Sequence, residues 1–213
     1  LGYQGWAGPE WLPRLPHHFA AYECFGDVNP LAGAIQTADR VIAVSPNYAD
    51  EIRRPESGMG LDHVLNDLGD RLIGIRNGID TVVWNPATDT SLRTNYSVDT
   101  LEDKAVAQED LLAAAGWEDN GDPVIGMVTR HVEQKGIDLA LDSIRYAANM
   151  PMRLVLLGSG SQQRAEWATW AACTWPDRIY FENGYNQQLA HTIFAGSDLL
   201  LMPSRFEPCG LAQ

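Results

Sequence analysis

The residues with the clearest chemical potential lie near the carboxyl end, where an apolar run leads into a turn that carries a carboxylate. Residues 198–204 (Asp-Leu-Leu-Leu-Met-Pro-Ser) have the pattern of a buried strand, and residues 205–211 (Arg-Phe-Glu-Pro-Cys-Gly-Leu) follow directly. Pro208 suits the first position of a helix, so we expect a helix to begin there. Backbone N–H groups at a helix N-terminus bind anions such as phosphate, and Gly210 lets a ligand approach the backbone closely. The stretch therefore predicts an anion site beside Glu207.

Two cations and a glycine-rich turn follow other apolar runs upstream. Arg130 and Lys135 come after the run 124–129. A Gly-Ser-Gly turn begins at Gly158, directly after the run 153–157. Positive side chains neutralise a departing pyrophosphate as a metal ion does elsewhere, and a glycine-rich turn admits a phosphate close to the backbone. Together these groups predict a cradle for a diphosphate.

Each of these groups also has a plainer interpretation. A single Arg or Lys in a loop after a strand is more often a solvated surface charge, and such loops use glycine routinely. Cys209 alone is typical of a small buried residue, and Glu207 alone is typical of helix capping. The sequence has no Asp-x-Asp motif or histidine-rich ligand set, which favours a mechanism without a metal ion. From the residues alone, their convergence predicts only a site for an anionic ligand.

The elements that position these groups alternate regularly from Pro123 onward. Apolar runs of strand length are followed by helical periodicities, with strands expected at 124–129, 153–157, 178–181 and 199–202 and helices at 137–149, 162–173 and 187–195. This alternation predicts an α/β fold, a Rossmann-like doubly wound parallel sheet with right-handed crossovers. Ligands of such sheets bind beyond the carboxyl ends of the strands. The cations, the glycine-rich turn and Glu207 are therefore expected along one rim.

The first half of the chain predicts a second set of elements. Asn29 as N-cap and Pro30 at the first position indicate a helix over 29–37. The remaining expectations are a strand at 40–45, a helix that begins at Ser45-Pro46, a short helix at 61–68, a strand at 72–76, a tight Asn77-Gly78 turn, a surface loop at 84–100 and a helix at 101–115.

Composition excludes several classes of protein. The 213 residues include 15 Lys and Arg against 28 Asp and Glu, a net charge of −13, and this acidic balance disfavours nucleic-acid binding. Three cysteines without zinc-type spacing indicate neither a disulfide framework nor a structural metal site, and a reducing cytoplasm is the natural setting. No apolar run approaches the ~20 residues of a membrane span. The chain starts at Leu1 and stops at Gln213, just after the predicted helix begins, so we expect a fragment cut at both ends.

Residues 203–211 closely resemble the C-terminal signature of bacterial glycogen synthases and plant starch synthases. Further motifs of that family occur in the same order: Ala38-Asp39-Arg40-Val41, Val44-Ser45-Pro46-x-Tyr48-Ala49-x-Glu51-Ile52, Asn77-Gly78-Ile79-Asp80, Trp84-Asn85-Pro86-Ala87-Thr88-Asp89, Arg130-x4-Lys135-Gly136-x-Asp138-Leu139 and Ala195-Gly196-x-Asp198. The resemblance therefore covers nearly the whole chain.

This resemblance implies a retaining glucosyltransferase of two Rossmann-like domains, the GT-B architecture. Such enzymes transfer glucose from ADP-glucose, or UDP-glucose in some members, to the non-reducing end of an α-1,4-glucan. Residues 1–46 then resemble the tail of the N-terminal domain, 47–69 an interdomain linker with a helix, and 70–213 most of the C-terminal nucleotide-sugar-binding domain. The implied partners are the sugar nucleotide and the glucan, with no cofactor, nucleic acid or membrane, in the cytoplasm or in a plastid.

The resemblance also assigns functions to particular residues. Arg130 and Lys135 match the pair that contacts the donor diphosphate, and Glu207 matches the functional carboxylate near the sugar. Cys209, Gly210 and Leu211 match the backbone that faces the donor, and Gly158 belongs to the diphosphate cradle. Tyr185 matches a position where an aromatic ring stacks on the nucleotide base, although it is equally compatible with a rim aromatic.

The sequence departs from the family pattern in a few places. His131 stands where Leu is usual, Ala212 stands where Thr is common, and the Lys-x-Gly-Gly-Leu loop of the N-terminal domain is absent. This chain alone is therefore expected to be inactive. Two alternatives stay open: another nucleotide-sugar glycosyltransferase of the same architecture, and a noncatalytic module that binds a nucleotide sugar or a glucan.

Overall fold

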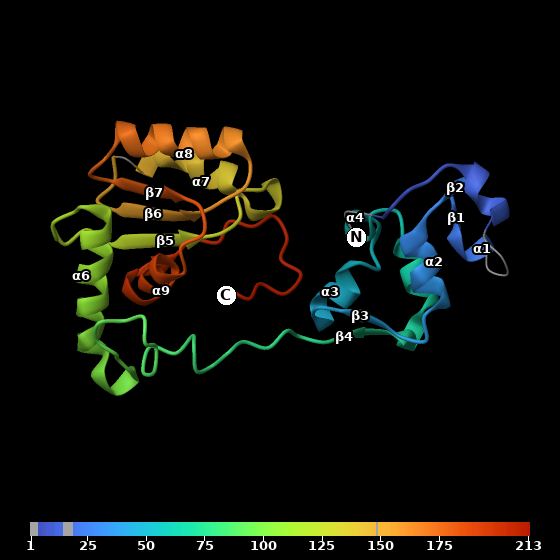
Figure 1. Cartoon of the computed structure of the whole chain (residues 1–213), viewed down its shortest axis with the longest axis horizontal. Coiled ribbons are helices and arrows are strands. Elements are labelled where there is room, and N and C mark those ends of the chain that lie inside the picture. The colour runs from blue at the N-terminus through green and yellow to red at the C-terminus, as the bar shows by residue number, and fades with distance from the viewer. Residues whose placement is uncertain (1–3, 15–18, 148) are drawn as a thin grey trace. The chain divides into compact units, whose positions relative to one another are not determined.

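The computed structural model describes residues 4–14, 19–147 and 149–213, which form two compact units (Figure 1). Unit 1 comprises Leu1–Gly78 and Glu207–Leu211. Unit 2 comprises Ile79–Phe206 and Ala212–Gln213. Each unit has its own hydrophobic core.

Unit 2 is built on a parallel sheet with the strand order β7-β6-β5-β8. The strands are β5 (Val124–Val128), β6 (Arg153–Gly158), β7 (Ile179–Asn183) and β8 (Leu199–Leu200). Val128 pairs with Leu157, and Gly158 pairs with Asn183, so the carboxyl ends of β5, β6 and β7 lie at one edge. The predicted doubly wound α/β sheet is confirmed.

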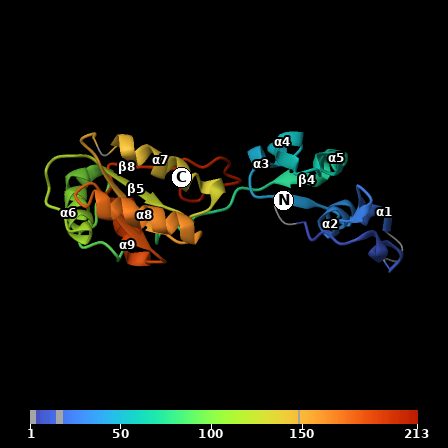
Figure 2. The same cartoon turned by 90° about the horizontal axis from the view of Figure 1, so that it is seen from above.

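Helices cover both faces of this sheet (Figures 1 and 2). They are α6 (Lys104–Ala115), α7 (Ile137–Ala147), α8 (Gln162–Thr174) and α9 (Gln187–Gly196). Leu154 and Leu156 pack with α7 and α8, whereas Val155 and Leu157 pack with α6 and α9. This alternation follows from the two-residue period of a strand, and it explains why residues 154–157 of β6 are all apolar. The helix predicted at 137–149 corresponds to α7, which ends at Ala147. Residue 148 of the predicted range lies outside the described residues.

Unit 1 contains short elements around a smaller core. They are η1 (Pro9–Arg14), α1 (Phe19–Tyr22), β1 (Glu23–Cys24), β2 (Asp27–Val28), α2 (Pro30–Thr37), β3 (Val41–Ala43), α3 (Pro46–Glu51), α4 (Pro55–Gly58), α5 (Asp62–Asp67), η2 (Gly69–Arg71) and β4 (Leu72–Gly74). Asn29 Oδ1 accepts the Ala32 N–H at 2.9 Å, and Ser45 Oγ accepts the Tyr48 N–H at 3.0 Å. Both predicted helix starts are confirmed.

The segment 47–69 packs in the core of unit 1. Ala49, Ile52 and Leu65 are buried in the same cluster as Ile35 and Leu72. The compact unit extends to Gly78, so its boundary differs from the boundaries that we predicted at residues 46 and 70. Helical periodicity located the elements of this segment but could not show that they share a core with β3 and β4.

Two predicted features differ in the structure. Residues 75–80 form no turn, and Gly78 does not adopt a positive φ. An Asn-Gly turn suits an antiparallel hairpin, whereas β4 pairs in parallel with β3, so no hairpin turn is needed here. Strand β8 was expected to be buried, but Leu199 is 60% exposed and Leu200 is 43% exposed. Among the described residues β8 pairs only with β5, and it is therefore an edge strand.

Candidate functional site

The loops after β5 and β6 pack directly against each other at the carboxyl edge of the sheet. Thr129 N–H donates to the Leu157 carbonyl oxygen at 3.0 Å, and His131 N–H donates to the Ser159 carbonyl oxygen at 2.7 Å. Ser161 N–H returns a hydrogen bond to the His131 carbonyl oxygen at 3.0 Å. These bonds continue the strand pairing beyond the sheet. They bring the loop that carries Arg130 next to the glycine-rich turn, as the topology predicted.

The glycine-rich turn has a packing requirement of its own. A Cβ atom at Gly158 would overlap the Thr129 carbonyl oxygen, and a Cβ at Gly160 would lie 2.6 Å from the His131 carbonyl oxygen. Both positions therefore need glycine so that the two loops can approach each other. This contact accounts for Gly158 without a ligand, and its predicted function in the diphosphate cradle stays a prediction.

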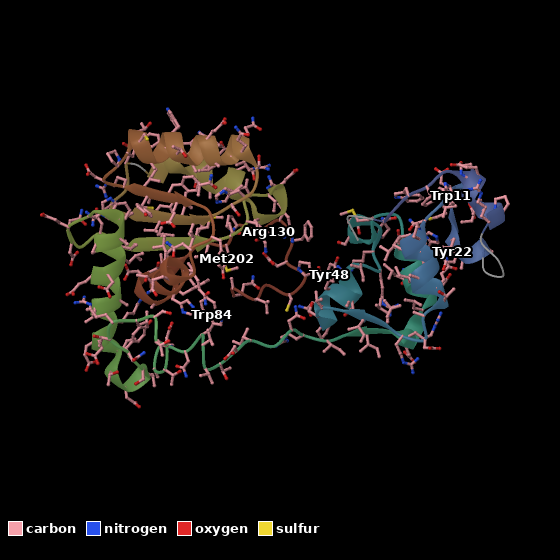
Figure 3. The ribbon with its side chains drawn as sticks, viewed as in Figure 1. Trp11, Tyr22, Tyr48, Trp84, Arg130 and Met202 are labelled. Atoms are coloured by element: carbon pink, nitrogen blue, oxygen red, sulfur yellow. The ribbon has the colours of Figure 1, made fainter. Side chains whose placement is uncertain are left out.

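The two predicted diphosphate contacts lie on the loop after β5. Arg130 is exposed beside the carboxyl end of the strand (Figure 3), and no described residue accepts a hydrogen bond from its guanidinium. Lys135 is half-buried at the end of the short 3-10 helix η4 (Glu133–Lys135). The loop thus presents one solvated cation and one cation in a partly enclosed position.

Arg205, a third cation of the rim, forms a bidentate ion pair with Asp138. Its Nη1 and Nη2 donate to the two carboxylate oxygens of Asp138 at 2.9 and 2.6 Å. The Arg205 guanidinium lowers the pKa of Asp138 from its ordinary value of 3.8 to about 2. The carboxylate is therefore ionised throughout the physiological range, and the pair persists.

His131 is buried between these loops. Its side chain is 1% exposed, its Nδ1 has no hydrogen-bond partner among the described residues, and its ring centroid lies 5.4 Å from that of Phe181. Burial lowers the pKa of His131 below its ordinary value of 6.5, so the imidazole is neutral at pH 7. The sequence marked this residue only as a departure from the usual Leu.

Tyr185 lies at the same edge of the sheet, after β7. The adjacent Gly184 N–H donates to the Gly158 carbonyl oxygen at 2.8 Å, and Asn186 caps α9 by accepting the Leu189 N–H at 2.9 Å. The Tyr185 side chain is 88% exposed, so its ring is accessible for stacking. Its contact with a base stays a prediction.

The residues after Phe206 do not form the predicted helix. Residues 207–213 contain bends and a turn, and Gly210 has a φ of +69°, which lies in the left-handed region. The predicted helix start at Pro208, which was expected to bind the donor, is therefore wrong for this structure.

Glu207, Cys209, Gly210 and Leu211 belong to unit 1, whereas the other predicted site residues belong to unit 2. Ser45 Oγ donates to the Pro208 carbonyl oxygen at 2.5 Å, which ties this segment to the start of α3. Glu207, Cys209 and Gly210 are half-buried, and Leu211 is exposed.

A buried His–Asp pair in unit 2, covered by a partly exposed tryptophan ring, was not predicted from the sequence. His191 Nδ1 lies 2.6 Å from Asp89 Oδ2, and the Trp84 ring stacks on the imidazole with centroids 4.1 Å apart and an interplanar angle of 5°. Ser91 N–H also donates to Asp89 at 2.8 Å. Figure 3 shows Trp84 below α9. The cluster attaches the first segment of unit 2 to that helix. The sequence contained Trp84 and Asp89 in one motif but gave no signal for their histidine partner.

Two family models match the chain. A starch synthase catalytic domain model matches residues 1–67, and a model of glycosyl transferases group 1 matches residues 110–213. The second match coincides with the parallel sheet and its loops in unit 2. Fold and matches together show that the chain is similar to glycosyltransferases of the GT-B class.

Curated relatives are glycogen synthases. The chain is 45% identical to glycogen synthase 1 of Methylococcus capsulatus over its full length, covering 44% of that protein. It is 40% identical to the glycogen synthase of Bacillus cereus, again over its full length, covering 46% of that protein. The comparisons confirm the resemblance to the glycogen and starch synthase family. The chain spans less than half the length of these relatives.

A solved structure with high similarity is the catalytic domain of starch synthase IV from Arabidopsis thaliana, bound to ADP and acarbose. It has a TM-score of 0.88 and 34% sequence identity, and the match covers 100% of this chain and 46% of that chain. TarM and WaaG, a glycosyltransferase of lipopolysaccharide biosynthesis, match with TM-scores of 0.51 and 0.54 at 12% and 13% identity. At that identity they show a common fold alone.

Two features are absent from the described residues: a membrane-spanning helix and a cluster of metal ligands. No helix within the described ranges combines the length and the apolar character that crossing a bilayer requires. Within the same ranges, no group of three or more His, Cys, Asp or Glu side chains is placed to hold a metal ion.

Proposed function

We propose that the protein containing this chain transfers glucose from ADP-glucose, or from UDP-glucose, to the non-reducing end of an α-1,4-glucan with retention, in glycogen or starch synthesis. The observation that carries the proposal is the similarity to a glycogen synthase along the whole chain, at 45% identity. The starch synthase IV structure, which contains ADP and acarbose, supports the same class of donor and acceptor. The bacterial relatives favour a cytoplasmic enzyme, with a plastid as the alternative if the source is a plant or alga.

Arg130 and Lys135 stabilise the departing nucleoside diphosphate in this proposal. Breaking the bond between the sugar and the diphosphate leaves negative charge on the phosphate oxygens, and fixed cations lower the energy of that charge. Arg130 offers a planar fork of donors, and Lys135 offers a compact ammonium group. The exposed position of Arg130 at the carboxyl edge of the sheet agrees with this function.

The remaining site residues act on the sugar and the base. We assign Glu207 to the sugar, near the reacting carbon, from its place in the Phe-Glu-Pro-Cys-Gly-Leu motif. The backbone of Cys209, Gly210 and Leu211 faces the donor, without the helix dipole. Tyr185 stacks on the nucleotide base, and its 88% exposure leaves a full ring face for that contact. Gly158 admits a phosphate next to the backbone.

The two compact units correspond to parts of two domains in this proposal. Residues 1–46, in unit 1, are the tail of an N-terminal Rossmann-like domain, and 47–69 are the linker with its helix; the starch synthase catalytic domain match at 1–67 supports this assignment. Residues 70–213, which include most of unit 2, are most of the C-terminal nucleotide-sugar-binding domain, and the group 1 match at 110–213 supports this assignment.

A transfer assay on the full-length gene product tests the proposal. Radiolabelled ADP-glucose is incubated with glycogen, and label is expected in the glucan, with UDP-glucose measured in parallel to establish the base preference. Release of the label by an α-1,4-specific amylase confirms the linkage. Donor binding without any transfer would instead support a noncatalytic module, and transfer only to a non-glucan acceptor would support another glycosyltransferase. The 213-residue chain alone is expected to elongate no glucan.

A further inference from the structure

The loop after β8 contacts the loop after β5 on both sides of Lys135. On the N-terminal side, Arg205 Nη1 donates to the Glu133 carbonyl oxygen at 2.8 Å, and Arg205 N–H donates to the Gln134 carbonyl oxygen at 2.9 Å. On the C-terminal side, the Arg205 guanidinium forms its bidentate pair with Asp138. A single side chain therefore bridges the residues that flank Lys135.

Two more contacts reinforce this junction. Gln134 Nε2 donates to the Phe206 carbonyl oxygen at 3.3 Å. Gly136, with a φ of +63°, approaches Pro203 so closely that a Cβ atom would overlap the Pro203 carbonyl oxygen. The backbone on each side of Lys135 is thus held by residues 203–206, which come almost 70 positions later in the chain.

We propose that Arg205 is a positioning residue, which through Asp138 and the Glu133 carbonyl holds the loop in the conformation that directs Lys135 to the donor diphosphate. The inference rests on the proposed function. A bidentate Arg–carboxylate pair fixes geometry as well as charge, which suits a positioning role. The fork of Arg205 is already occupied by the two Asp138 oxygens, so the positive charge of this residue serves the loop and not the ligand.

The Asp138→Asn variant distinguishes a positioning role of Arg205 from direct contact with the ligand, because the two roles predict opposite changes in the affinity for ADP. If Arg205 bound the diphosphate itself, neutralising Asp138 would release the guanidinium and leave ADP binding equal or tighter. If Arg205 positions Lys135, the same substitution loosens the loop and weakens ADP binding. We expect Kd for ADP to rise about tenfold in Asp138→Asn and in Arg205→Lys, the size of one lost charge-assisted hydrogen bond.

AMP serves as the internal reference, because it lacks the β-phosphate. Calorimetric titration of the full-length gene product and its variants with ADP and AMP gives the ratio of the Kd for AMP to the Kd for ADP. If Lys135 is no longer positioned, this ratio falls. General damage to the fold instead weakens the binding of ADP and AMP equally and leaves the ratio unchanged. Asp138→Glu keeps the carboxylate and is expected to restore most of the preference for ADP.

Arg93 provides a matched control. It pairs with Glu109 and Asp110 at 3.1 and 3.0 Å on another part of unit 2, and Arg93→Lys is expected to leave both nucleotides unaffected. An unchanged ratio in Asp138→Asn and Arg205→Lys, with normal binding by the unsubstituted chain, would overturn the positioning role alone. Failure of the unsubstituted full-length protein to bind ADP would overturn the proposed function together with it.

Discussion

His191 Nδ1 and Asp89 Oδ2 form a hydrogen-bonded pair at 2.6 Å, buried beneath the stacked ring of Trp84. The two residues join the segment that enters unit 2 to α9, on the opposite face of the sheet from α7 and α8. A buried polar pair of this kind stabilises a structure only while both members are present, because either one alone is left desolvated.

Removing one member of this pair is expected to destabilise unit 2. In Asp89→Ala the imidazole stays buried without its acceptor, and we expect a loss of about 3 kcal/mol. Hydrogen exchange of the α9 amides and urea unfolding measure the change. Asp99→Ala, at an exposed acidic position of the same unit, is the control and is expected to stay within about 0.5 kcal/mol. Equal effects of the two substitutions would contradict the structural importance of the pair.

The same carboxylate predicts an acid-dependent loss of stability. Burial raises the pKa of Asp89, but hydrogen bonds from Ser91 and His191 outweigh burial, so the pKa lies below the ordinary value of 3.8. The unfolded chain therefore takes up this proton at a higher pH than the folded chain does. The stabilisation is complete above about pH 4 and is lost as the pH falls through the folded pKa. Urea midpoints at pH 5, 4 and 3 are expected to fall less steeply in Asp89→Asn than in the unsubstituted chain.

Replacing His131 by Leu is expected to stabilise unit 2 by about 1 kcal/mol at pH 7, because the substitution removes a buried Nδ1 without a partner. The gain is expected to grow as the pH falls below about 6.5, since the unfolded chain protonates His131 and the folded chain resists it. Thermal unfolding at pH 7.5 and 5.5 measures both effects. His63→Gln, at an exposed histidine of unit 1, is the control, and a His131→Leu variant with no gain at either pH would refute the prediction.

Gly158→Ala is expected to destabilise the carboxyl edge of the sheet by about 1–3 kcal/mol, because the added Cβ would overlap the Thr129 carbonyl oxygen. Gly78→Ala, at a position with no atom within 4 Å of the added Cβ, is the matched control and is expected to be nearly neutral. Denaturant unfolding of the two variants gives the comparison. Equal free energies of unfolding for Gly158→Ala and Gly78→Ala would show that the loops after β5 and β6 can separate without cost.

In the full-length gene product, Lys135→Ala and Glu207→Ala are each expected to slow glucosyl transfer by orders of magnitude. Lys135→Ala removes a cation that stabilises the leaving diphosphate, so it is expected to lower kcat more than it raises KM for the donor. Glu207→Ala acts at the sugar and is expected to leave the affinity for ADP, which has no sugar, within about twofold. Initial-rate kinetics and ADP titration measure these effects. Unchanged turnover in either variant would refute its assigned role.

Much of the fold follows from local features of the sequence. The alternation of apolar runs with helical periodicity predicted the parallel sheet of unit 2 and the edge where Arg130, Gly158 and Tyr185 lie. Capping residues located two helix starts in unit 1 because a cap bonds an amide only three positions away. The glycogen synthase motifs, which occur in the same order as in that family, indicated the family from the sequence alone.

The tertiary structure alone decided how these side chains are used. In the sequence Arg205 only followed the last apolar run, and its pairing with Asp138 across 67 positions was visible only once the two loops were packed together. His191 and Asp89, 102 positions apart, were joined by the packing of a loop on α9. The segment after Phe206 has helix-starting residues, yet residues 207–213 form bends and a turn. Propensity acts over a few residues, whereas these pairings depend on contacts between loops that are distant in the chain, and so the sequence could not specify them.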